Sequence, residues 1–275
     1  MTEAQSAPRA QLGVFGGSGF YSFLDDVSTF ELSTPYGAPS APVAVGRIED
    51  RSVAFIPRHG VDHQFVPHQV PARANLWAMH MLGVGRIVGP CAAGSLKPEF
   101  APGDFVVCDQ LVDRTRGRDD TFYDRGDAHH VSFADPYCDD LSAAAVTAGR
   151  SIGVTVHDGG TVVVVPGPRF STRAESRWYR DQGWEVINMT QYPEAYLARE
   201  LGMCYANISL ITDYDTGVEG EPHVEPVTQE QVFQFFEDNV VRVRELLFEL
   251  LPTVSLERDS CSCADARGPL PDFSA

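Results

Sequence analysis

Lysine is almost absent from this chain, which has Lys97 as its only lysine among 275 residues. Acidic residues outnumber Lys and Arg by 38 to 21, and the formal net charge at pH 7 is −17. Nucleic acids and anionic membranes are bound through basic surfaces. The composition therefore predicts neither nucleic acid nor membrane as a partner. A small anionic substrate remains compatible with it, because a few local Arg and His side chains can outweigh the global charge.

The chain also lacks an apolar run of about 18 residues, the minimum for a transmembrane helix. Residues 1–5 show neither the basic nor the apolar region of a signal peptide. The six cysteines, at positions 91, 108, 138, 204, 261 and 263, form no Cys-x-x-Cys or Cys/His zinc spacing. These absences predict a reduced, cytoplasmic protein without a bound metal.

The length allows one large core in one or two domains. Apolar periodicity ends after Pro252, and the remaining residues are polar with Gly268, Pro269 and Pro271. We expect one domain over residues 1–254 and a flexible tail over residues 255–275. No internal repeat is visible.

A stretch from residue 161 to residue 190 has the strongest local pattern. Its apolar run 161–165 predicts a buried strand that ends at Pro and Gly. Thr172 and Glu175, three residues apart, predict a capped helix start. Such strand-to-helix turns often carry ligand sites in α/β proteins.

Three side chains near this turn suit a flat, polar ligand. Phe170 could stack on a ring, Ser171 could hydrogen-bond it, and Thr190 offers a hydroxyl on the next turn. The alternative is a tight turn with ordinary packing.

Two earlier loops could bind an anion. Residues 12–20 form a short strand and a glycine-rich loop with Ser18, although the loop matches neither a P-loop nor a full Rossmann fingerprint. Arg58, His59 and His63 follow a second strand, where a guanidinium could clamp phosphate with two parallel hydrogen bonds. The alternative is a solvated arginine beside a satisfied histidine.

A strand that begins at residue 87 is expected to end in the small residues over 89–96, where a ligand can approach the backbone. Cys91 lies among them and could equally be a buried packing residue. Asp213 and Asp215 end another apolar strand, so the two carboxylates are expected on one side of extended chain. They could form a metal pair, an acid/base pair or helix caps, and no third cluster supports a metal.

Helical spacing predicts helices over residues 70–82, 141–151, 192–201 and 228–251. The last is expected to be capped at Thr228 and to pack on the core through an apolar stripe that begins at Val232. Glu194 in the third could lie beneath a sugar. Residues 116–126 read as a polar loop, and His130 follows it in a region that the local pattern describes as solvated.

Taken in chain order, these motifs resemble the trimeric type of nucleoside phosphorylase, and within it the methylthioadenosine phosphorylases. The resemblance covers about residues 11 to 250 and rests on the glycine-rich loop, Arg58-His59-Gly60, Gly167-Pro168-Arg169-Phe170, Asn188-Met189-Thr190 and Asp213-Tyr214-Asp215. It implies one α/β domain with a mixed, twisted sheet flanked by helices. A homotrimer is implied by the family alone, and a hexamer stays open.

The resemblance implies phosphorolysis of 5′-methylthioadenosine to adenine and 5-methylthioribose 1-phosphate, without a cofactor and with inorganic phosphate as co-substrate. Asp213 would be the proton donor to the purine and Asp215 the acceptor from its 6-amino group. The phosphate-binding residues implied are Ser18, Arg58, His59, Cys91, Ala92 and Thr190. The nucleoside-binding residues implied are Phe170, Ser171, Met189, Asp213, Asp215 and, from a neighbouring subunit, His130.

One position departs from the pattern: methylthioadenosine members usually carry Thr where this chain has Cys91, which removes a hydroxyl from the phosphate shell. Three alternatives remain: a phosphorylase of methylthioinosine or another 6-oxopurine nucleoside, a hydrolase of the same fold, and a non-catalytic nucleoside-binding protein. The 5′ substituent of the substrate is also open.

The tail contains Cys261-Ser262-Cys263. Two reduced thiols without consequence are one interpretation. The other is a strained, reversible disulfide in a tail that folds back on the protein, which is similar to the Cys-x-Cys of some family members from hot environments.

Overall fold

The computed structural model describes residues 9–17, 20, 22, 24–124, 128–217, 226–271 and 273, without the side chains of residues 236 and 237. The strands are β1 (Leu12–Gly16), β2 (Ser28–Phe30), β3 (Val43–Ile48), β4 (Arg51–Pro57), β5 (Arg86–Ser95), β6 (Phe105–Val107), β7 (Gln110–Asp113), β8 (Val156–Asp158), β9 (Thr161–Val164), β10 (Val186–Asn188) and β11 (Cys204–Asp213). The helices are α1 (Ala72–Met81), α2 (Asp139–Ser151), α3 (Arg173–Asp181), α4 (Gln191–Glu200) and α5 (Gln229–Thr253), with 3₁₀ turns at Pro67–Gln69 and Cys263–Ala266. The predicted α/β class is confirmed.

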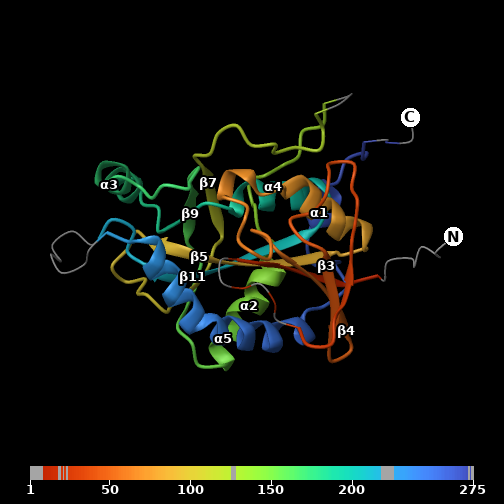
Figure 1. The fold of residues 1–275 in the computed structure, drawn as a ribbon, viewed down its shortest axis with the longest axis horizontal. Coiled ribbons are helices and arrows are strands. Elements are labelled where there is room, and N and C mark those ends of the chain that lie inside the picture. The colour runs from red at the N-terminus through yellow and green to blue at the C-terminus, as the bar shows by residue number, and fades with distance from the viewer. Residues whose placement is uncertain are drawn as a thin grey trace.

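The strands form one mixed sheet with a branch. Its main path runs β2-β3-β4-β1-β5-β10-β9-β7, and β11 pairs with both β5 and β6. β1 is parallel to β4 and β5, and β11 is parallel to β5, whereas β10 is antiparallel to β5. Figure 1 shows α1 and α4 on one face of the sheet and α2 and α5 on the other. The arrangement is the predicted single domain of a twisted sheet between helices.

Each face of the sheet has its own apolar core, because successive strand residues point to opposite faces. Phe15 packs with Leu76 of α1 and Leu197 of α4, whereas the preceding Val14 packs with Leu141 of α2 and Leu246 of α5. The described residues contain no helix that is both long and apolar enough to cross a membrane.

The predicted helix caps are confirmed in detail. The Thr172 hydroxyl accepts from the Glu175 main-chain N–H at 3.2 Å, and the Glu175 carboxylate accepts from the Thr172 N–H at 2.8 Å. Thr228 and Gln231 form the same reciprocal pair at the start of α5. Each of these reciprocal pairs, known as capping boxes, satisfies two backbone N–H donors that would otherwise be unpaired. The pair therefore determines where its helix begins.

The small residues over 89–95 form the last part of β5, which ends at Ser95, as predicted. β11 pairs with β5 as far as Gly94, whereas β1 pairs only with residues 86–88 and β10 only with residues 94 and 95. Among the described residues, one edge of β5 over residues 89–93 therefore has no paired strand, which leaves this backbone open to a ligand.

The described part of the predicted tail packs on the domain. Arg258 Nη1 donates to the carbonyl of Gly202 at 2.6 Å, and Ser260 Oγ donates to Asp140 Oδ2 at 2.5 Å. Cys263 is buried, and the Gly268 N–H donates to the Tyr123 hydroxyl at 3.1 Å. The sequence predicts a flexible tail here, whereas these contacts are those of a packed segment.

Candidate active site

The register of β10 against β5 determines where the site forms. Val186 lies opposite Ser95 and Ile187 opposite Gly94, so the chain leaving β10 runs back along β5. A cavity of about 330 Å³ opens there, beside the carboxyl ends of β1, β4 and β11. Its lining includes most of the residues that the sequence singles out, namely Arg58, His59, His63, Cys91, Ala92, Phe170, Ser171, Met189, Thr190, Asp213 and Asp215.

Two predicted positions are not among these lining residues. Ser18 lies outside the described residues, although the neighbouring Gly17 lines the cavity. His130 is exposed on the loop after residue 127 and does not line this cavity within one chain. Its predicted role depends on a second copy and stays a prediction.

Arg58 is buried beside the cavity and already has a partner on one edge. Its Nε and Nη2 donate to the two carboxylate oxygens of Glu194 at 2.6 and 2.7 Å, and its Nη1 donates to the Pro90 carbonyl at 3.2 Å. Burial opposes the charged form, but Glu194 outweighs it and raises the pKa of Arg58. Glu194 therefore occupies the edge of the guanidinium formed by Nε and Nη2. Only Nη1 remains to face an anion.

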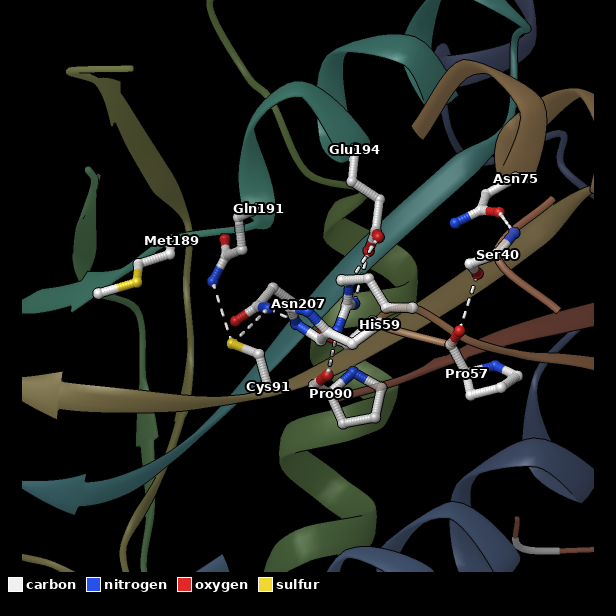
Figure 2. Close-up of polar contacts among 12 residues, drawn as sticks. Ser40, Pro57, His59, Asn75, Pro90, Cys91, Met189, Gln191, Glu194 and Asn207 are labelled. Carbon is white, nitrogen blue, oxygen red and sulfur yellow. Dashed lines mark hydrogen bonds and ion pairs between the residues drawn. The ribbon is translucent and has the colours of Figure 1, made fainter. Parts of the chain in front are cut away.

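Glu194 is not beneath the cavity floor where the sequence suggested a sugar contact. Its carboxylate receives Arg58 and, at 2.6 Å, the hydroxyl of buried Tyr205. Figure 2 shows Glu194 pointing from α4 toward the sheet. The prediction was wrong because Arg58 follows β4, far away in sequence, and a buried cation requires a counterion.

His59 and His63 stack at the cavity rim with ring centroids 4.6 Å apart. Burial, partly offset by the hydrogen bond to the Phe65 carbonyl, lowers the pKa of His59 to about 3. His59 Nδ1 lies 2.8 Å from that carbonyl, which can only accept. The proton therefore resides on Nδ1, and Nε2 of the neutral ring is an acceptor.

A polar network lies behind Cys91, inside the sheet. The sulfur accepts from Asn188 Nδ2 at 3.3 Å and from Asn207 Nδ2 at 3.4 Å, and it lies 3.6 Å from Ser209 Oγ. Gln191 Nε2 also points to it at 3.9 Å, as Figure 2 shows. Amide donors that converge on one buried sulfur would serve a hydroxyl oxygen at least as well.

Replacing Cys91 with Thr is therefore expected to preserve phosphate binding or to lower the KM for phosphate by about threefold, the effect of one modest hydrogen bond. The measurement is steady-state kinetics with phosphate as the varied substrate. Cys91→Val is the matched control, since Val has the shape of Thr without the hydroxyl. A similar rise in KM for both variants would show that Cys91 is a packing residue with no room for a branched side chain.

Asp213 and Asp215 meet at the end of β11 through a turn. The Asp215 N–H donates to Asp213 Oδ1 at 2.7 Å, and the Thr212 hydroxyl donates to Asp213 Oδ2 at 2.6 Å. Asp215 has a φ of 55°, in the left-handed region that non-glycine residues rarely adopt. The sequence predicted that the two carboxylates lie close together, which the structure confirms. It also predicted an extended chain, which was wrong because Asp215 adopts the left-handed conformation.

Both carboxyl groups are biased toward protonation. Burial raises the pKa of Asp213, and it raises the pKa of Asp215 to about 6, with nearby Asp213 acting in the same direction. Gly94 allows this approach, because a Cβ there would lie 3.0 Å from Asp213 Oδ1. Two neighbouring carboxyls with raised pKa values can donate and accept protons in one site.

The cavity lining has polar atoms that are not fully used. Among the described residues, Asn188 Oδ1 is buried without a hydrogen-bond partner, and Asp215 Oδ2 and Ser171 Oγ make no hydrogen bond of standard geometry, although the Ser171 and Ser176 hydroxyls lie near the Asp215 carboxylate. The Thr190 hydroxyl, at the N-cap of α4, makes no capping bond. Buried polar atoms are nearly always satisfied in native proteins, so these atoms indicate a missing ligand.

Arg118 and the start of α5 escaped the sequence interpretation. Arg118 Nη2 donates to the carbonyls of Pro166 at 3.1 Å and Met189 at 2.7 Å, and Nη1 donates to Tyr192. It thereby joins the two loops that bear Phe170 and Met189. Its sequence context is a polar loop, which gave no signal of this role.

Gln229, Val232 and Phe233, in the first turns of α5, complete one wall of the cavity. The sequence assigned Val232 to the core-facing stripe, and this assignment was wrong for that residue. The helix extends beyond the sheet at its N-terminal end, so the periodic stripe that packs on the core further along faces the cavity here.

An Arg and a His at strand ends face a pair of carboxyl groups across one cavity. This arrangement suits an enzyme that holds an anion beside an acid or base. Residues 11–252 match the Phosphorylase superfamily, and the chain belongs to that family.

Among its relatives, S-methyl-5′-thioadenosine phosphorylase of Mycolicibacterium smegmatis is 55% identical over 258 residues, covering 94% of this chain and 96% of that one. A purine nucleoside phosphorylase of Streptomyces coelicolor is 49% identical over 270 residues, covering 94% and 95%. The solved methylthioadenosine phosphorylase of Schistosoma mansoni in complex with adenine superposes with a TM-score of 0.85 at 35% identity, covering 90% of this chain and 93% of that one.

Proposed function

We infer that the chain is a pentosyltransferase that cleaves 5′-methylthioadenosine with phosphate, releasing adenine and 5-methylthioribose 1-phosphate. The observation that carries this is the single cavity with an anion-binding side, Arg58 and His59, and a base-binding side, Asp213, Asp215 and Ser171. Relatives named for this activity, 48 to 55% identical over nearly the whole chain, support it.

In the proposed reaction, a phosphate oxygen attacks C1′ as the purine leaves, and the sugar passes through an oxocarbenium-like state. Holding the anion beside the developing cation supplies proximity and electrostatic stabilisation. We assign this to Ser18, Arg58, His59, Cys91, Ala92 and Thr190, and no cofactor is required. Because neutral His59 has its acceptor at Nε2, it would suit the P–OH group of hydrogen phosphate.

The departing base needs a proton or a hydrogen bond at N7. Asp213, whose pKa is raised by burial, is the proposed donor. Asp215 Oδ2, which is buried and makes no hydrogen bond of standard geometry, would accept from the 6-amino group. Phe170 would stack on the purine, Ser171 would bond it, and Met189 would lie against the ribose.

Selectivity for the 6-amino group is expected to be pH-dependent. Asp215 accepts well only when ionised, and its pKa is about 6. The ratio of kcat/KM for 5′-methylthioadenosine to that for 5′-methylthioinosine should therefore fall as pH drops below 6, because the protonated carboxyl can donate to a 6-oxo group. A ratio of two substrates cancels the ionisation of phosphate itself.

In Asp215→Asn, whose amide does not titrate, this ratio should shift toward 5′-methylthioinosine and lose its dependence on pH. A variant that keeps both the ratio and the pH dependence of the parent would contradict the role assigned to Asp215.

A 6-oxopurine nucleoside phosphorylase is the second candidate, favoured by the Streptomyces coelicolor relative of that broader name. Product analysis separates the candidates: 5′-methylthioadenosine and inosine are each incubated with and without phosphate. Adenine release that requires phosphate supports the first proposal. Faster hypoxanthine release selects the second, phosphate-independent release indicates a hydrolase, and no release of either base indicates a binding protein.

We further propose a cytoplasmic homotrimer in which His130 of one subunit reaches the sugar end of a neighbouring site. The free thiols of all six cysteines are compatible with a reducing compartment, and the exposed position of His130 leaves it available to a neighbour. Sedimentation equilibrium measures the assembly, and a monomer with full activity would remove His130 from the mechanism.

A further inference from the structure

Four of the six cysteines meet at one point that lies outside the catalytic cavity. Cys138, Cys204, Cys261 and Cys263 place their sulfur atoms within 4.8 Å of one another. Cys138 is the residue before α2, Cys204 begins β11, and the other two belong to the packed C-terminal segment. Three of the four are buried, and Cys261 is half-buried.

The distances suit a metal site with four thiolates. A tetrahedron with metal–sulfur bonds of about 2.3 Å has sulfur–sulfur edges of about 3.8 Å. The sulfurs of Cys204 and Cys261 lie 3.5 Å apart, and none of the four cysteines is in a disulfide. Four mutually close sulfurs supply the donor number and type of a closed structural site.

The surroundings are also those of a thiolate cluster. Arg86 is buried, and its Nη1 donates to the sulfurs of Cys204 at 3.5 Å and Cys138 at 3.8 Å. None of the ion pairs among the described residues includes Arg86. A buried cation needs a counter-charge, and the net negative charge of a metal bound by four thiolates would provide it.

Hydrogen bonds that do not involve sulfur position Cys138 and the chain just before Cys261. The Cys138 N–H donates to the carbonyl of Tyr205, the residue after Cys204, at 2.9 Å. This bond holds Cys138 beside Cys204. Arg258 on Gly202 and Ser260 on Asp140 anchor the chain just before Cys261. The ligands are therefore positioned by contacts that do not depend on a metal, as expected of a site built into the fold.

We propose that these four cysteines bind one zinc ion, which fastens the C-terminal segment to the start of β11 and α2. Tetrahedral sulfur ligation selects zinc among the common divalent ions, with iron as the main competitor. Each thiol loses its proton on binding, so loading releases four protons and weakens at low pH. Cys204 and Asp213 lie at opposite ends of β11, about 30 Å apart along the strand. A metal at the cysteines would therefore be too far from the cavity to take part in the reaction, and its role is structural.

The test begins with the full-length protein, purified under reducing conditions from zinc-supplemented medium. Mass spectrometry of metals should find about one zinc per chain, and Cys261→Ser/Cys263→Ser should retain less than about a tenth of that, because loss of two ligands removes most of the affinity. Cobalt exchanged into the parent should give the intense visible bands of a tetrahedral thiolate complex, a measurement that needs no variant. Cys108→Ser, which changes another buried cysteine, should keep its zinc.

A chelator should lower the melting temperature of the parent but not that of the double variant. Three results would overturn the proposal. One is a reduced parent that binds neither zinc nor cobalt. Another is a denatured, unreduced parent with two reactive thiols in place of six, which would mean two disulfides. The third is equal zinc content in the parent and the double variant.

Discussion

Asp213→Asn is expected to lower kcat on 5′-methylthioadenosine by about 10²-fold, because general acid catalysis contributes roughly 10²–10⁴-fold and an amide has no proton to transfer. Asp213 lies at the end of β11, and burial raises the pKa of its carboxyl toward the range where it can act as an acid. The measurement is the rate of adenine release at saturating nucleoside and phosphate.

A substrate with a cationic base provides the sharper test. The N7-methylated analogue leaves without receiving a proton, so the variant should recover most of its relative rate on that analogue. Asp181→Asn, an exposed Asp on α3, is the matched control and should behave like the parent. An unchanged kcat in Asp213→Asn, or an equal loss on both substrates, would assign the proton transfer elsewhere.

Arg58→Met is expected to raise the KM for phosphate by about 10- to 100-fold, the effect of losing one hydrogen bond to a charged group. It should also lower the free energy of unfolding by about 3–5 kcal/mol, because Glu194 would be left as a buried, unpaired charge. Kinetics with phosphate varied and urea unfolding measure the two effects separately.

The double variant Arg58→Met/Glu194→Gln separates binding from folding. Its buried pair is neutral, and the new amide oxygen would still accept from the Tyr205 hydroxyl, so most of the lost stability should return. The KM for phosphate should stay high. If phosphate binding returned together with stability, Arg58 would be a structural residue whose removal had distorted the site.

The sequence was sufficient wherever the determinants are local. The pair of Thr172 and Glu175 and the cap at Thr228 could be predicted from the sequence as helix starts, and the structure confirms both. The buried strand over residues 161–164 follows from its valines. Most proposed site residues also gather around one cavity, because motifs at strand ends converge when the strands share a sheet edge.

Partners that come from distant segments could not be predicted. No residue near Glu194 in the sequence indicates that Arg58 will bind its carboxylate. The polar residues around Arg118 likewise give no sign of its hydrogen bonds to four carbonyls. The four clustered cysteines have no zinc-like spacing, because α2, β11 and the C-terminal segment bring them together only in the folded chain. Asp215 needed a left-handed turn, and its sequence gave no glycine signal for one.

The two sides of the cavity are formed by different kinds of structural element. Arg58 and Cys91 are fixed by the sheet, through the Glu194 ion pair and the network behind β5, whereas Phe170, Ser171, Val232 and Phe233 project from a loop and a helix end. Substitutions in the loop and helix end can reshape the pocket for another base or 5′ group without disturbing the sheet. Natural or engineered substitutions could therefore change which nucleoside the chain accepts, while the residues proposed to bind phosphate stay in place.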